Sequence, residues 1–338
     1  MKAIVINSPG QLALKEMKRP IPDRGEVLLK LLYGGICGSD LGAYRGSFAY
    51  VSYPRIPGHE FSAEVVEVND NGTGLSPGMI VTANPYFNCG KCYSCRRGLV
   101  NCCKANQTMG VQREGAFAQY ITMPVERIYP GQGLCPKTLA LIEPLCIGYH
   151  GIERGQVKAG DRVLVVGGGG IGILAALAAK SRGAGVYLAD VSPAKLKLAS
   201  SLGIDGTFLS DAMDSYTDAV EKFTGGDGFD VAIEAVGLPE TFQGCIDVAA
   251  FGGSVVVIGV SKKRLEFDFT LIQKKELRVF GSRNATRADF ENVIELVKSG
   301  RIDPAKIITD VYNWQEAGKA FAEFDKSAGH KLKVMLEF

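Results

Sequence analysis

The sequence predicts a chain of the α/β class with an additional β part, in which a doubly wound parallel sheet follows a domain of short strands. Residues 1 to about 145 consist of short apolar or alternating runs separated by glycine and proline, which is typical of β structure. From about residue 148, apolar runs alternate regularly with helical segments, which indicates a parallel sheet with right-handed crossovers. A glycine cluster follows the first of these apolar runs.

The strands of the first domain are expected in four apolar or alternating segments. They lie at 3–6, 11–16, 26–33 and 64–68. The second domain is expected to hold strands at 162–166, 185–190, 230–235, 253–260 and 277–281. Its helices are expected near 171–182, 192–202, 211–224, 239–250 and 268–275.

The end of the chain is expected to return to the first domain. Two helices are predicted at 287–299 and 314–326, followed by a last strand at 331–338. The predicted organisation is therefore a catalytic domain at 1–147 and 285–338, interrupted by a nucleotide-binding domain at 148–284.

The composition is that of an ordinary globular protein and makes several classes of partner improbable. Hydrophobic residues make up 46% and charged residues 22% of the 338 residues, which allows two cores. The net charge of +2 argues against a nucleic-acid partner, and no apolar run reaches the roughly 18 residues needed to span a bilayer. The N-terminus lacks the pattern of a signal peptide, so we expect no membrane partner and a cytoplasmic location.

The stretch V-L-V-V-G-G-G-G-I-G at 163–172 has the pattern of a dinucleotide-binding βαβ unit. Gly167 allows a tight turn after the strand, and Gly169 lets the backbone approach a pyrophosphate at the helix N-terminus. Gly172 allows close packing of helix and sheet. Asp190 closes the next apolar run and can accept hydrogen bonds from both ribose hydroxyls of an adenosine. Because its charge would repel a 2′-phosphate, the sequence favours NAD over NADP.

A cluster of cysteines at 89–103 predicts a metal-binding lobe, at about 86–105. Four of the nine cysteines, in two successive C-x-x-C steps and a further position, can close a tetrahedral shell of thiolates. Such a shell leaves no place for a substrate, so zinc here would be structural. The first three ligands would be Cys89, Cys92 and Cys95, whereas both Cys102 and Cys103 could be the fourth.

A second, dispersed set of metal-ligating residue types lies in the motifs G-I-C-G-S-D, P-G-H-E and I-E-P, at Cys37, His59 and Glu143. One thiolate, one imidazole and one carboxylate would leave a coordination position open for an alcohol oxygen, as a catalytic zinc site requires. Spacing alone does not single this set out, since a lone cysteine or histidine is more often a packing residue.

Taken together and in this order, these motifs make the chain similar to the zinc-dependent medium-chain alcohol dehydrogenases over essentially its whole length. That family combines a GroES-like β-barrel catalytic domain with a Rossmann domain, and its active site lies in the cleft. The resemblance implies Cys37, His59 and Glu143 as ligands of a catalytic zinc, and it favours Cys103 over Cys102 as the fourth ligand of a structural zinc. It also implies that Glu60 approaches the catalytic zinc during ligand exchange.

The resemblance further implies residues for proton transfer and cofactor binding. Ser39 would take the proton from the alcohol. The glycine-rich turn would bind the cofactor together with Gly170 and Ile171, and the backbone near Ile258, Val260, Ser282 and Arg283 would border the nicotinamide. Many members place a histidine five residues after the ligand cysteine, at the outer end of the proton relay, where this chain has Gly42.

Within the family, the motifs around Cys37, Glu143 and 281–286 resemble the branch of polyol, threonine and sugar-acid dehydrogenases. This implies an NAD-dependent enzyme, with two zinc ions per subunit, that oxidises a secondary hydroxyl of a sugar acid of the L-gulonate or L-galactonate type to a ketone. A guanidinium matches a carboxylate bidentately. Residues considered for substrate binding are Arg283, Asn284, Arg113 and Tyr44, although cofactor contact or solvent exposure suits the arginines equally and packing suits Tyr44 better.

Several alternatives stay open at this point. A neutral polyol of the sorbitol type or L-threonine would fit the same fold and metals. A zinc-free reductase of the same superfamily, or a non-enzymatic NAD-binding redox sensor or regulator, would differ in class. The apolar strand at 277–280 could pair across a two-fold axis, so a homodimer or a homotetramer is expected.

Overall fold

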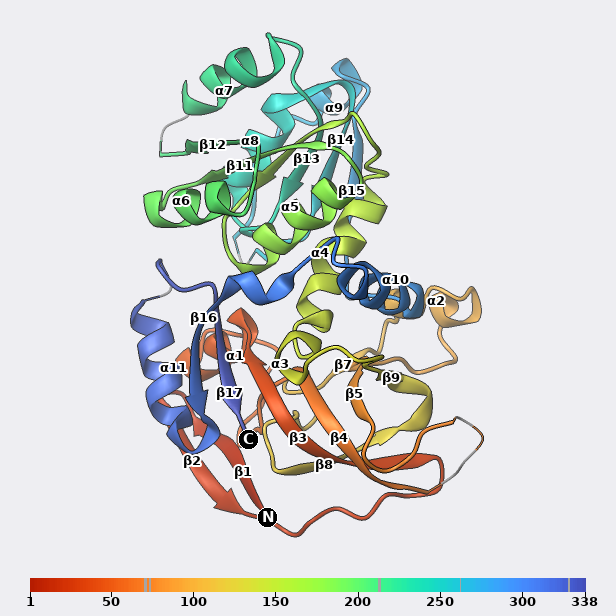
Figure 1. Cartoon of the computed structure of the whole chain (residues 1–338). Helices are drawn as coiled ribbons and strands as arrows, with labels where there is room; N and C mark the ends of the chain where they lie inside the picture. The colour runs from red at the N-terminus through yellow and green to blue at the C-terminus, as the bar shows by residue number, and fades with distance from the viewer. Residues whose placement is uncertain (70–71, 73, 212–213, 262, 328) are drawn as a thin grey trace. The chain divides into compact units, whose positions relative to one another are not determined.

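The computed structural model describes residues 1–69, 72, 74–211, 214–261, 263–327 and 329–338, and the chain divides into two compact units (Figure 1). The first unit comprises Met1–Glu143 and Ala285–Phe338, and the second comprises Pro144–Asn284. The first boundary lies four residues earlier than the predicted end of the first domain at 147. It falls inside a helix, α4 (Ile142–Arg154), which the sequence analysis did not predict.

The first unit is built around a seven-stranded sheet. Its central strand, β3, pairs with three other strands, because β4, β8 and β17 all lie antiparallel to it. The strands of the sheet, in spatial order, are β16 (Ile308–Asn313), β17 (Lys333–Glu337), β3 (Glu26–Ile36), β4 (Glu60–Val68), β5 (Ile80–Ala83) and β9 (Ile128–Pro130), with β8 (Tyr120–Pro124) beside β3. The last strand thus returns to the first unit, as predicted.

Two smaller sheets and a set of helices complete this unit. The small sheets are β1 (Lys2–Ser8) with β2 (Gln11–Glu16), and β6 (Tyr86–Phe87) with β7 (Gln107–Thr108). The helices are α1 (Gly38–Arg45), α2 (Tyr93–Arg96), α3 (Pro136–Leu139), α10 (Arg287–Lys298) and α11 (Ala317–Lys326). The start of the predicted helix 314–326 is a 3₁₀ turn at Trp314–Glu316.

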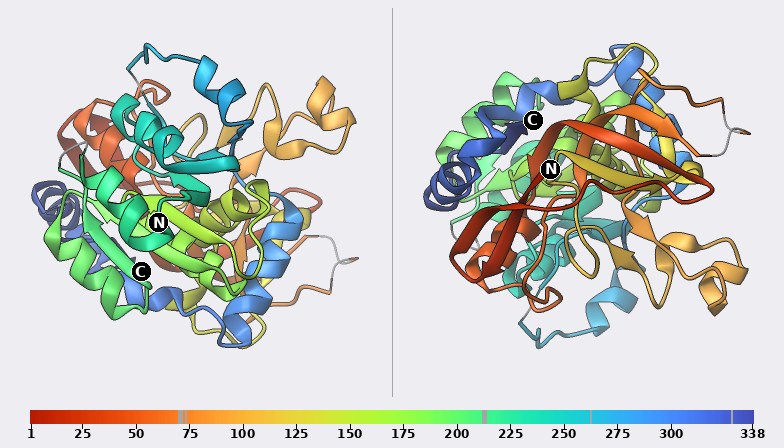
Figure 2. Two further views of the ribbon diagram at one scale, coloured as in Figure 1. Left: turned by 90° about the horizontal axis from the view of Figure 1, so that it is seen from above. Right: turned by 90° about the horizontal axis from the view of Figure 1, so that it is seen from below.

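The first unit has one large core, and a lobe projects from it. Fully buried Phe61, Phe117 and Phe321 belong to the core, which also contains the aliphatic faces of β1, β3 and β4. The segment with α2 stands away from the sheet in Figures 1 and 2. No residue of α2 is buried. The lobe therefore has little core of its own.

The second unit is a six-stranded parallel sheet whose spatial order is that of a Rossmann fold. The strands are β12 (Gly206–Leu209), β11 (Gly185–Asp190), β10 (Arg162–Val166), β13 (Phe229–Glu234), β14 (Ala249–Val257) and β15 (Arg278–Gly281). Neighbouring strands are parallel throughout. The central strands β10 and β13 are almost fully buried, which explains why their sequences are continuous apolar runs.

In the second unit, the sequence pattern missed one strand and misplaced another; in the first unit, it did not predict the strands β5, β6, β7, β8, β9 and β16. β12 is a four-residue edge strand without a fully buried side chain, so its sequence has no apolar run that would mark it. β14 begins at Ala249, inside the predicted helix 239–250, and ends before the predicted end at 260. The backbone of Ala249 is already extended, with φ −64° and ψ 136°, so the preceding helix ends at Val248.

The helices of the second unit connect successive parallel strands. They are α5 (Gly170–Ser181), α6 (Pro193–Ser201), α7 (Asp214–Thr224), α8 (Pro239–Val248) and α9 (Thr270–Lys274). Residues 212–213 of the predicted helix 211–224 lie outside the described residues, and the helix is observed from Asp214. α5 packs on β10 and β11, and α8 packs on β13 and β14, as crossover helices of a parallel sheet do.

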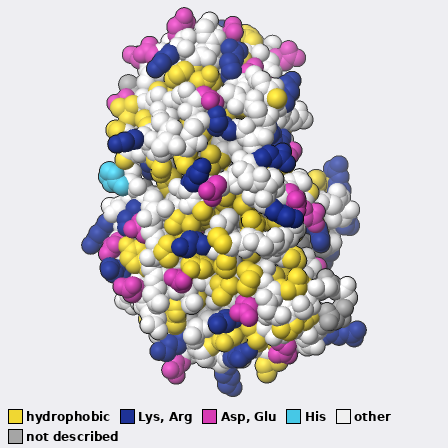
Figure 3. All heavy atoms as spheres, viewed as in Figure 1, with side chains coloured by type: hydrophobic (Ala, Val, Ile, Leu, Met, Phe, Trp, Pro, Cys, Tyr) yellow, Lys and Arg dark blue, Asp and Glu magenta, His cyan; other side chains and the backbone are white. Residues whose placement is uncertain are grey.

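On the face shown in Figure 3, acidic and basic side chains are interspersed and not gathered by sign. Among the described residues, no helix combines the length and the apolar character that crossing a membrane requires.

Candidate metal centres and dinucleotide site

The four predicted thiolate ligands of the lobe lie together. The sulfur atoms of Cys89, Cys92, Cys95 and Cys103 are all within 4.8 Å of one another. The Cys92 sulfur lies 3.5 Å from that of Cys95 and 4.0 Å from that of Cys103. This is the grouping that a tetrahedral metal with four thiolates requires.

Local backbone geometry prepares the lobe thiols for metal binding. Backbone N–H groups of Cys95 and Lys104 lower the pKa of Cys92 to about 6. Burial raises the pKa of Cys103 to about 11. A metal ion bound by the four sulfur atoms would require all of them as thiolates, so its binding would compete with the proton at Cys103.

The structure also separates the two candidates for the fourth position. Cys102 is exposed, whereas Cys103 is fully buried and its sulfur accepts a hydrogen bond from the backbone N–H of Cys89, at 3.2 Å. The 3₁₀ turn Val100–Cys102 ends just before Cys103. The turn therefore places the two adjacent side chains in different environments.

A second group of metal-ligating side chains lies within the first unit. The candidate ligand atoms of Cys37, His59 and Glu60 are all within 4.8 Å of one another. The expected third ligand, Glu143, does not belong to this compact group. The carboxylate next to the histidine takes that place, because β4 begins at Glu60 and continues directly from His59.

Close packing of the backbone determines where His59 lies. Gly58, which precedes it, has φ +95°, and a Cβ atom there would lie 2.2 Å from the ring of the fully buried Phe117. Only glycine fits both the conformation and the space. The motif P-G-H-E thus places His59 in the interior of the first unit, and the residue is only 5% exposed.

Asp40 holds together the two parts of the group formed by Cys37, His59 and Glu60. We call this group, with the side chains that contact it, the mixed centre or mixed group. One of its carboxylate oxygens accepts a hydrogen bond from the backbone N–H of Cys37, at 3.0 Å, and the other accepts from Gly58, at 2.9 Å. The second oxygen is also 3.9 Å from Nδ1 of His59. A single buried carboxylate in the first turn of α1 therefore positions the thiol and the imidazole.

Glu60 is held by a buried cation from the other end of the chain. Lys333 Nζ lies 2.7 Å and 2.6 Å from the two carboxylate oxygens of Glu60, and both side chains are at least 95% buried. Burial disfavours a charged lysine, but Glu60 and Cys37 more than offset this and raise the pKa of Lys333. Lys333 thus holds both carboxylate oxygens of Glu60 in place.

Glu143 lies near the mixed group but is held by a different residue. Its Oε1 atom accepts a hydrogen bond from the hydroxyl of Tyr86. Burial and the nearby Glu60 raise the pKa of Glu143 to about 7, against the opposing effects of His59 and Tyr86. With a pKa of about 7, the carboxyl group of Glu143 is partly protonated at physiological pH. It interacts electrostatically with His59.

The electrostatics of the mixed group fit a bound cation. Burial disfavours protonation of His59, but Cys37, Asp40 and Glu143 more than offset it and raise its pKa well above the usual value. Nδ1 of His59 is buried without a hydrogen-bond partner. Several anionic groups around one imidazole in a buried place suit a divalent cation, and one sulfur, one nitrogen and one oxygen are donors that zinc accepts.

The residues expected to carry the proton lie in α1. Ser39 is the second residue of the helix, is partly exposed, and directly follows the turn that bears Cys37. Gly42 is buried, and a Cβ atom at this position would lie 3.1 Å from that of Phe48. A histidine at position 42 would have to displace Phe48, so this chain has no relay group at that position.

The glycine-rich turn of the second unit has the geometry of a pyrophosphate site. Gly167 follows β10 with φ +108°, and Gly169 is the N-cap of α5 with an extended backbone. A Cβ atom on Gly172 would lie 1.8 Å from the carbonyl oxygen of Gly167, so only glycine allows this approach of helix and turn. Gly170 and Ile171 are the first two residues of α5, where backbone N–H groups face outward along the helix axis.

Asp190 ends β11 beside this turn, as the motif requires. Its carboxylate accepts hydrogen bonds from the backbone N–H groups of Gly168, at 2.6 Å, and Ser192, at 2.8 Å. Lys195 Nζ lies 3.8 Å from the same carboxylate. These contacts hold the acid at the carboxyl edge of the sheet. Val191 and Val236 are exposed after β11 and β13 at the same edge, where they offer apolar surface to a flat ring.

The other expected cofactor contacts follow β14 and β15. The backbone N–H of Ile258 donates to the carbonyl of Glu234, at 2.9 Å, and that of Ser282 donates to Val257, at 2.9 Å. Val260 is 69% exposed. Arg283 is exposed after β15, and Asn284 has φ +53°. All of them are in the second unit.

Two residues considered for substrate binding are engaged elsewhere. The Arg113 guanidinium lies 3.5 Å from the ring centroid of Phe87, on the wall of a groove lined also by Ile56 and Tyr120. The Tyr44 ring packs edge-on against Phe321, with centroids 5.7 Å apart. Tyr44 is therefore a packing residue, and Arg113 stacks on an aromatic ring in the first unit.

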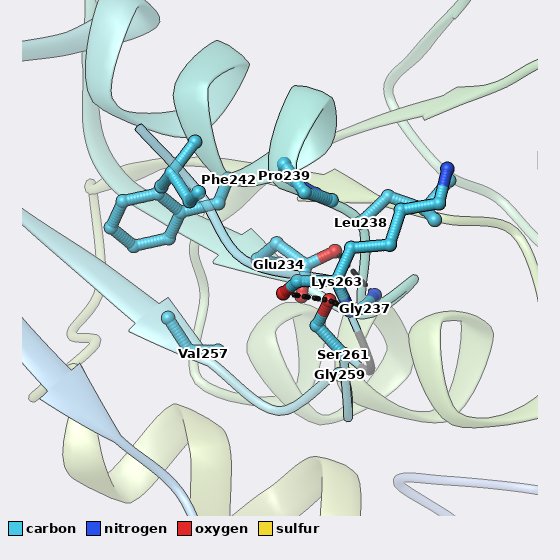
Figure 4. A pocket seen from close by; sticks show the side chains of 10 residues that line it. Glu234, Gly237, Leu238, Pro239, Phe242, Val257, Gly259, Ser261 and Lys263 are labelled. Carbon is cyan, nitrogen blue, oxygen red and sulfur yellow. Dashed lines mark hydrogen bonds between the residues drawn. The ribbon is translucent and has the colours of Figure 1, made fainter. Parts of the chain in front are cut away.

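A small pocket of the second unit lies where β13 and β14 end (Figure 4). Its walls are largely apolar, and Phe242, Leu238 and Val257 contribute to them. The buried Glu234 faces it but accepts hydrogen bonds from the backbone N–H groups at 236 and 237 and from the hydroxyl of Thr241. Glu234 thus stabilises the turn after β13. Its Oε1 atom accepts all three of these hydrogen bonds and is not placed for acid–base chemistry.

Sequence reasoning missed three residues of the mixed centre: Asp40, Tyr86 and Lys333. For Asp40 a local signal existed, because an acid three residues after an N-cap is typical of a capping box. For Tyr86 and Lys333 no local signal existed. They reach the centre from 57 residues before Glu143 and 273 residues after Glu60.

Family models match both parts of the chain. Residues 23–133 match the model described as alcohol dehydrogenase GroES-like domain, and residues 170–299 match the model described as zinc-binding dehydrogenase. The first segment lies within the first unit, and the second covers most of the second unit and continues into α10 of the first.

Similar proteins extend over nearly the whole chain. L-galactonate-5-dehydrogenase of Escherichia coli K12 is 35% identical over 92% of this chain and 92% of its own length. Sorbitol dehydrogenase of Halalkalibacterium halodurans is 34% identical over 99% of each. Among solved structures, the dehydrogenase rspB of E. coli CFT073, in complex with NADH, superposes with a TM-score of 0.94 at 31% identity and covers 100% of this chain and 99% of its own.

Proposed function

Because this chain belongs to the zinc-dependent medium-chain alcohol dehydrogenases and is a dehydrogenase that uses zinc and a nicotinamide dinucleotide, we propose that it oxidises a secondary hydroxyl of a sugar acid with NAD. The proposed substrate is a sugar acid of the L-gulonate or L-galactonate type, and its hydroxyl is oxidised to a ketone. The grouping of Cys37, His59 and a buried glutamate is the observation that carries the proposal, since an incomplete protein shell leaves a position for the alcohol oxygen.

Two zinc sites with different tasks are part of the proposal. The four cysteines of the lobe bind a structural ion, and the mixed centre binds a catalytic one through Cys37, His59 and either Glu60 or Glu143. When bound at the mixed centre, zinc acts as a Lewis acid that makes the alcohol proton easier to remove. The nicotinamide supplies the hydride chemistry.

The protein's own groups then bind, orient and move the proton. The hydroxyl oxygen of Ser39, in the first turn of α1, accepts the proton of the alcohol while its own proton passes onward to the nicotinamide ribose, so that the serine stays neutral. Asp40 keeps Cys37 and His59 in register through backbone N–H groups. Lys333 holds the carboxylate of Glu60 beside Cys37 and His59. Orientation of this kind can supply roughly 7–11 kcal/mol of the barrier.

The proposed preference for NAD rests on Asp190. A carboxylate at the carboxyl edge of β11 accepts hydrogen bonds from ribose hydroxyls and repels a 2′-phosphate. Asp190→Ser should reduce the ratio of kcat/KM for NAD to that for NADP by about 10- to 100-fold, since hydrogen bonds to a charged group contribute roughly 1.5–3 kcal/mol. An unchanged ratio would remove Asp190 from the proposal.

In this proposal Arg283 binds the carboxylate of the substrate, and Asn284 contributes hydrogen bonds to sugar hydroxyls. Support comes from the exposure of Arg283 directly after β15 and from similarity to L-galactonate-5-dehydrogenase. Arg283→Met should raise the KM for an aldonate by about 10-fold or more, as loss of a bidentate charged pair predicts. Arg283→Lys is a matched control, because it keeps the positive charge and loses the bidentate geometry of the guanidinium.

The first experiment is a substrate panel followed by NADH absorbance, with and without a chelator. It contains L-gulonate, L-galactonate, other aldonates, sorbitol, galactitol and L-threonine. Chelator-sensitive oxidation of an aldonate supports the proposal. A preference for sorbitol, as the similarity to sorbitol dehydrogenase allows, or for L-threonine keeps the metals and discards the role of Arg283. Tight NADH binding without turnover of any of these substrates would favour a sensor or regulator.

The proposed assembly is a homodimer or a homotetramer that uses the edge of the parallel sheet. β15 pairs on one side with β14 only, and Val279 in it is 40% exposed. An apolar edge strand is a template for pairing with a second copy. Val279→Lys should shift the molar mass in light scattering toward the monomer, and an unchanged mass would place the interface elsewhere.

A further inference from the structure

Tyr86 makes a buried contact with the mixed metal centre that neither the motifs nor the proposed chemistry assign. Its hydroxyl donates a hydrogen bond to Oε1 of Glu143. Tyr86 is 8% exposed and Glu143 is 2% exposed, so the bond is shielded from water. A hydrogen bond to a carboxylate in such a place is stronger than a neutral one and directs the carboxylate.

Hydrogen bonds hold the backbone of Tyr86 on both sides of the residue. Its N–H donates to Oδ1 of Asn84, at 2.9 Å, and its carbonyl accepts from Nη1 of Arg127. The same guanidinium donates to Asn88, at 3.0 Å, and lies over the ring of Phe87. The two-residue strand β6 also pairs with β7. The hydroxyl is therefore presented to Glu143 by a rigid support.

The two glutamates near the centre are anchored in different ways. Lys333 contacts both carboxylate oxygens of Glu60, at 2.7 and 2.6 Å. The phenol of Tyr86 donates to one of the two carboxylate oxygens of Glu143, Oε1. A carboxylate with one oxygen held in this way can offer a metal, or a group bound to it, a single oxygen in a defined direction.

We propose that Tyr86 is a positioning residue of the metal centre: it holds Oε1 of Glu143 so that only Oε2 faces the metal and its substrate. This inference rests on the proposed function, because it requires a metal at Cys37 and His59. Without the phenol, Glu143 would be free to rotate and to bind through both oxygens, and the ligand geometry would change.

The test compares Tyr86→Phe with Tyr33→Phe as a matched control. Tyr33 also donates its hydroxyl to a glutamate, Glu337 at 2.5 Å, in the same unit but outside the centre. Cobalt is loaded into both variants and into wild type. The visible spectrum of the mixed centre is obtained as the difference from Cys37→Ala loaded in the same way, and the metal affinity is measured by competition with a chelator.

Tyr86→Phe should shift the cobalt bands of the mixed centre and weaken metal binding there by about 10- to 100-fold, as loss of an outer hydrogen bond to a ligand does. Tyr33→Phe should match wild type in both readouts. Urea unfolding of the two variants establishes that Tyr86→Phe is folded. Bands and affinity of Tyr86→Phe that coincide with wild type would overturn the inference while leaving the proposed function intact.

A double-variant cycle tests whether Tyr86 acts through Glu143. Glu143→Gln keeps an acceptor oxygen but removes the charge. If Tyr86 acts through Glu143, the effects of the two substitutions on metal affinity are strongly non-additive. Additive effects would overturn the inference. Failure of wild type to bind metal at the mixed centre would instead refute the proposed function, and the inference with it.

Discussion

The two metal-type centres of this protein are built in opposite ways. The ligands of the lobe all come from residues 89–103, and the backbone of that segment also adjusts the thiols, as the low pKa of Cys92 illustrates. The mixed centre takes Cys37 from the start of a helix and His59 and Glu60 from the start of a strand, and Lys333 reaches it from the last strand.

The difference shows which features hold the ligands in place: the local backbone at the lobe, and tertiary packing at the mixed centre. The lobe has a closed set of four like donors and little core of its own, so in the proposed function a metal ion would hold it together. The mixed centre has unlike donors, a buried carboxylate that positions them, and two anchored glutamates. Its geometry is held by the β core of the first unit and does not depend on a bound ion.

The largest expected effect separates catalysis from stability. Cys37→Ala removes a ligand of the mixed centre only. The kcat/KM for the alcohol should fall roughly 1000-fold or more, because a Lewis acid contributes several kcal/mol to the transition state. Bound zinc should fall from two to one per chain by elemental analysis, with a nearly unchanged unfolding temperature. Loss of both metal ions would show that the two centres are not independent.

The next effect tests the long-range anchor. Lys333→Met leaves the carboxylate of Glu60 buried without its cation, which costs about 3–5 kcal/mol. Urea unfolding should show this loss. The double variant Lys333→Met/Glu60→Gln should recover most of it, because the unpaired charge is gone. If the double variant is no more stable than the single one, the loss comes from packing of the lysine stem.

A smaller and local effect is expected in the lobe. Cys92→Ser removes one thiolate of the four, and the zinc content should fall by one equivalent. Proteolysis should then cut within 89–103, while the two units stay folded, since local segments open independently of the core. Global unfolding together with this cleavage would mean that the lobe supports the first unit and is not merely attached to it.

The smallest effect distinguishes the two adjacent cysteines. Cys102→Ser should leave zinc content and activity unchanged, because Cys102 is exposed. Cys103→Ser at the neighbouring position should lose one zinc equivalent, because the buried sulfur of Cys103 belongs to the group of four. Equal loss in both variants would show that the lobe can exchange its fourth ligand.

The amino-acid sequence by itself determined the features that depend on neighbours along the chain. The spacing of four cysteines, the glycines at 167, 169 and 172, and the apolar runs of β10, β11 and β13 each carry their physical reason within a few residues. The parallel sheet and the returning last strand followed from regular alternation, and the chain's family followed from these motifs in order.

The tertiary structure alone decided which groups complete the mixed centre. Glu60, and not Glu143, joins Cys37 and His59 in the compact group, because β4 starts at that residue and Lys333 lies opposite. No periodicity or motif links Tyr86 to Glu143, or Lys333 to Glu60, since each pair meets only through the packing of separate strands and helices. Likewise, only the short half-buried edge strand β12 escaped the pattern of the parallel sheet, because a strand without a buried face carries no hydrophobic signal.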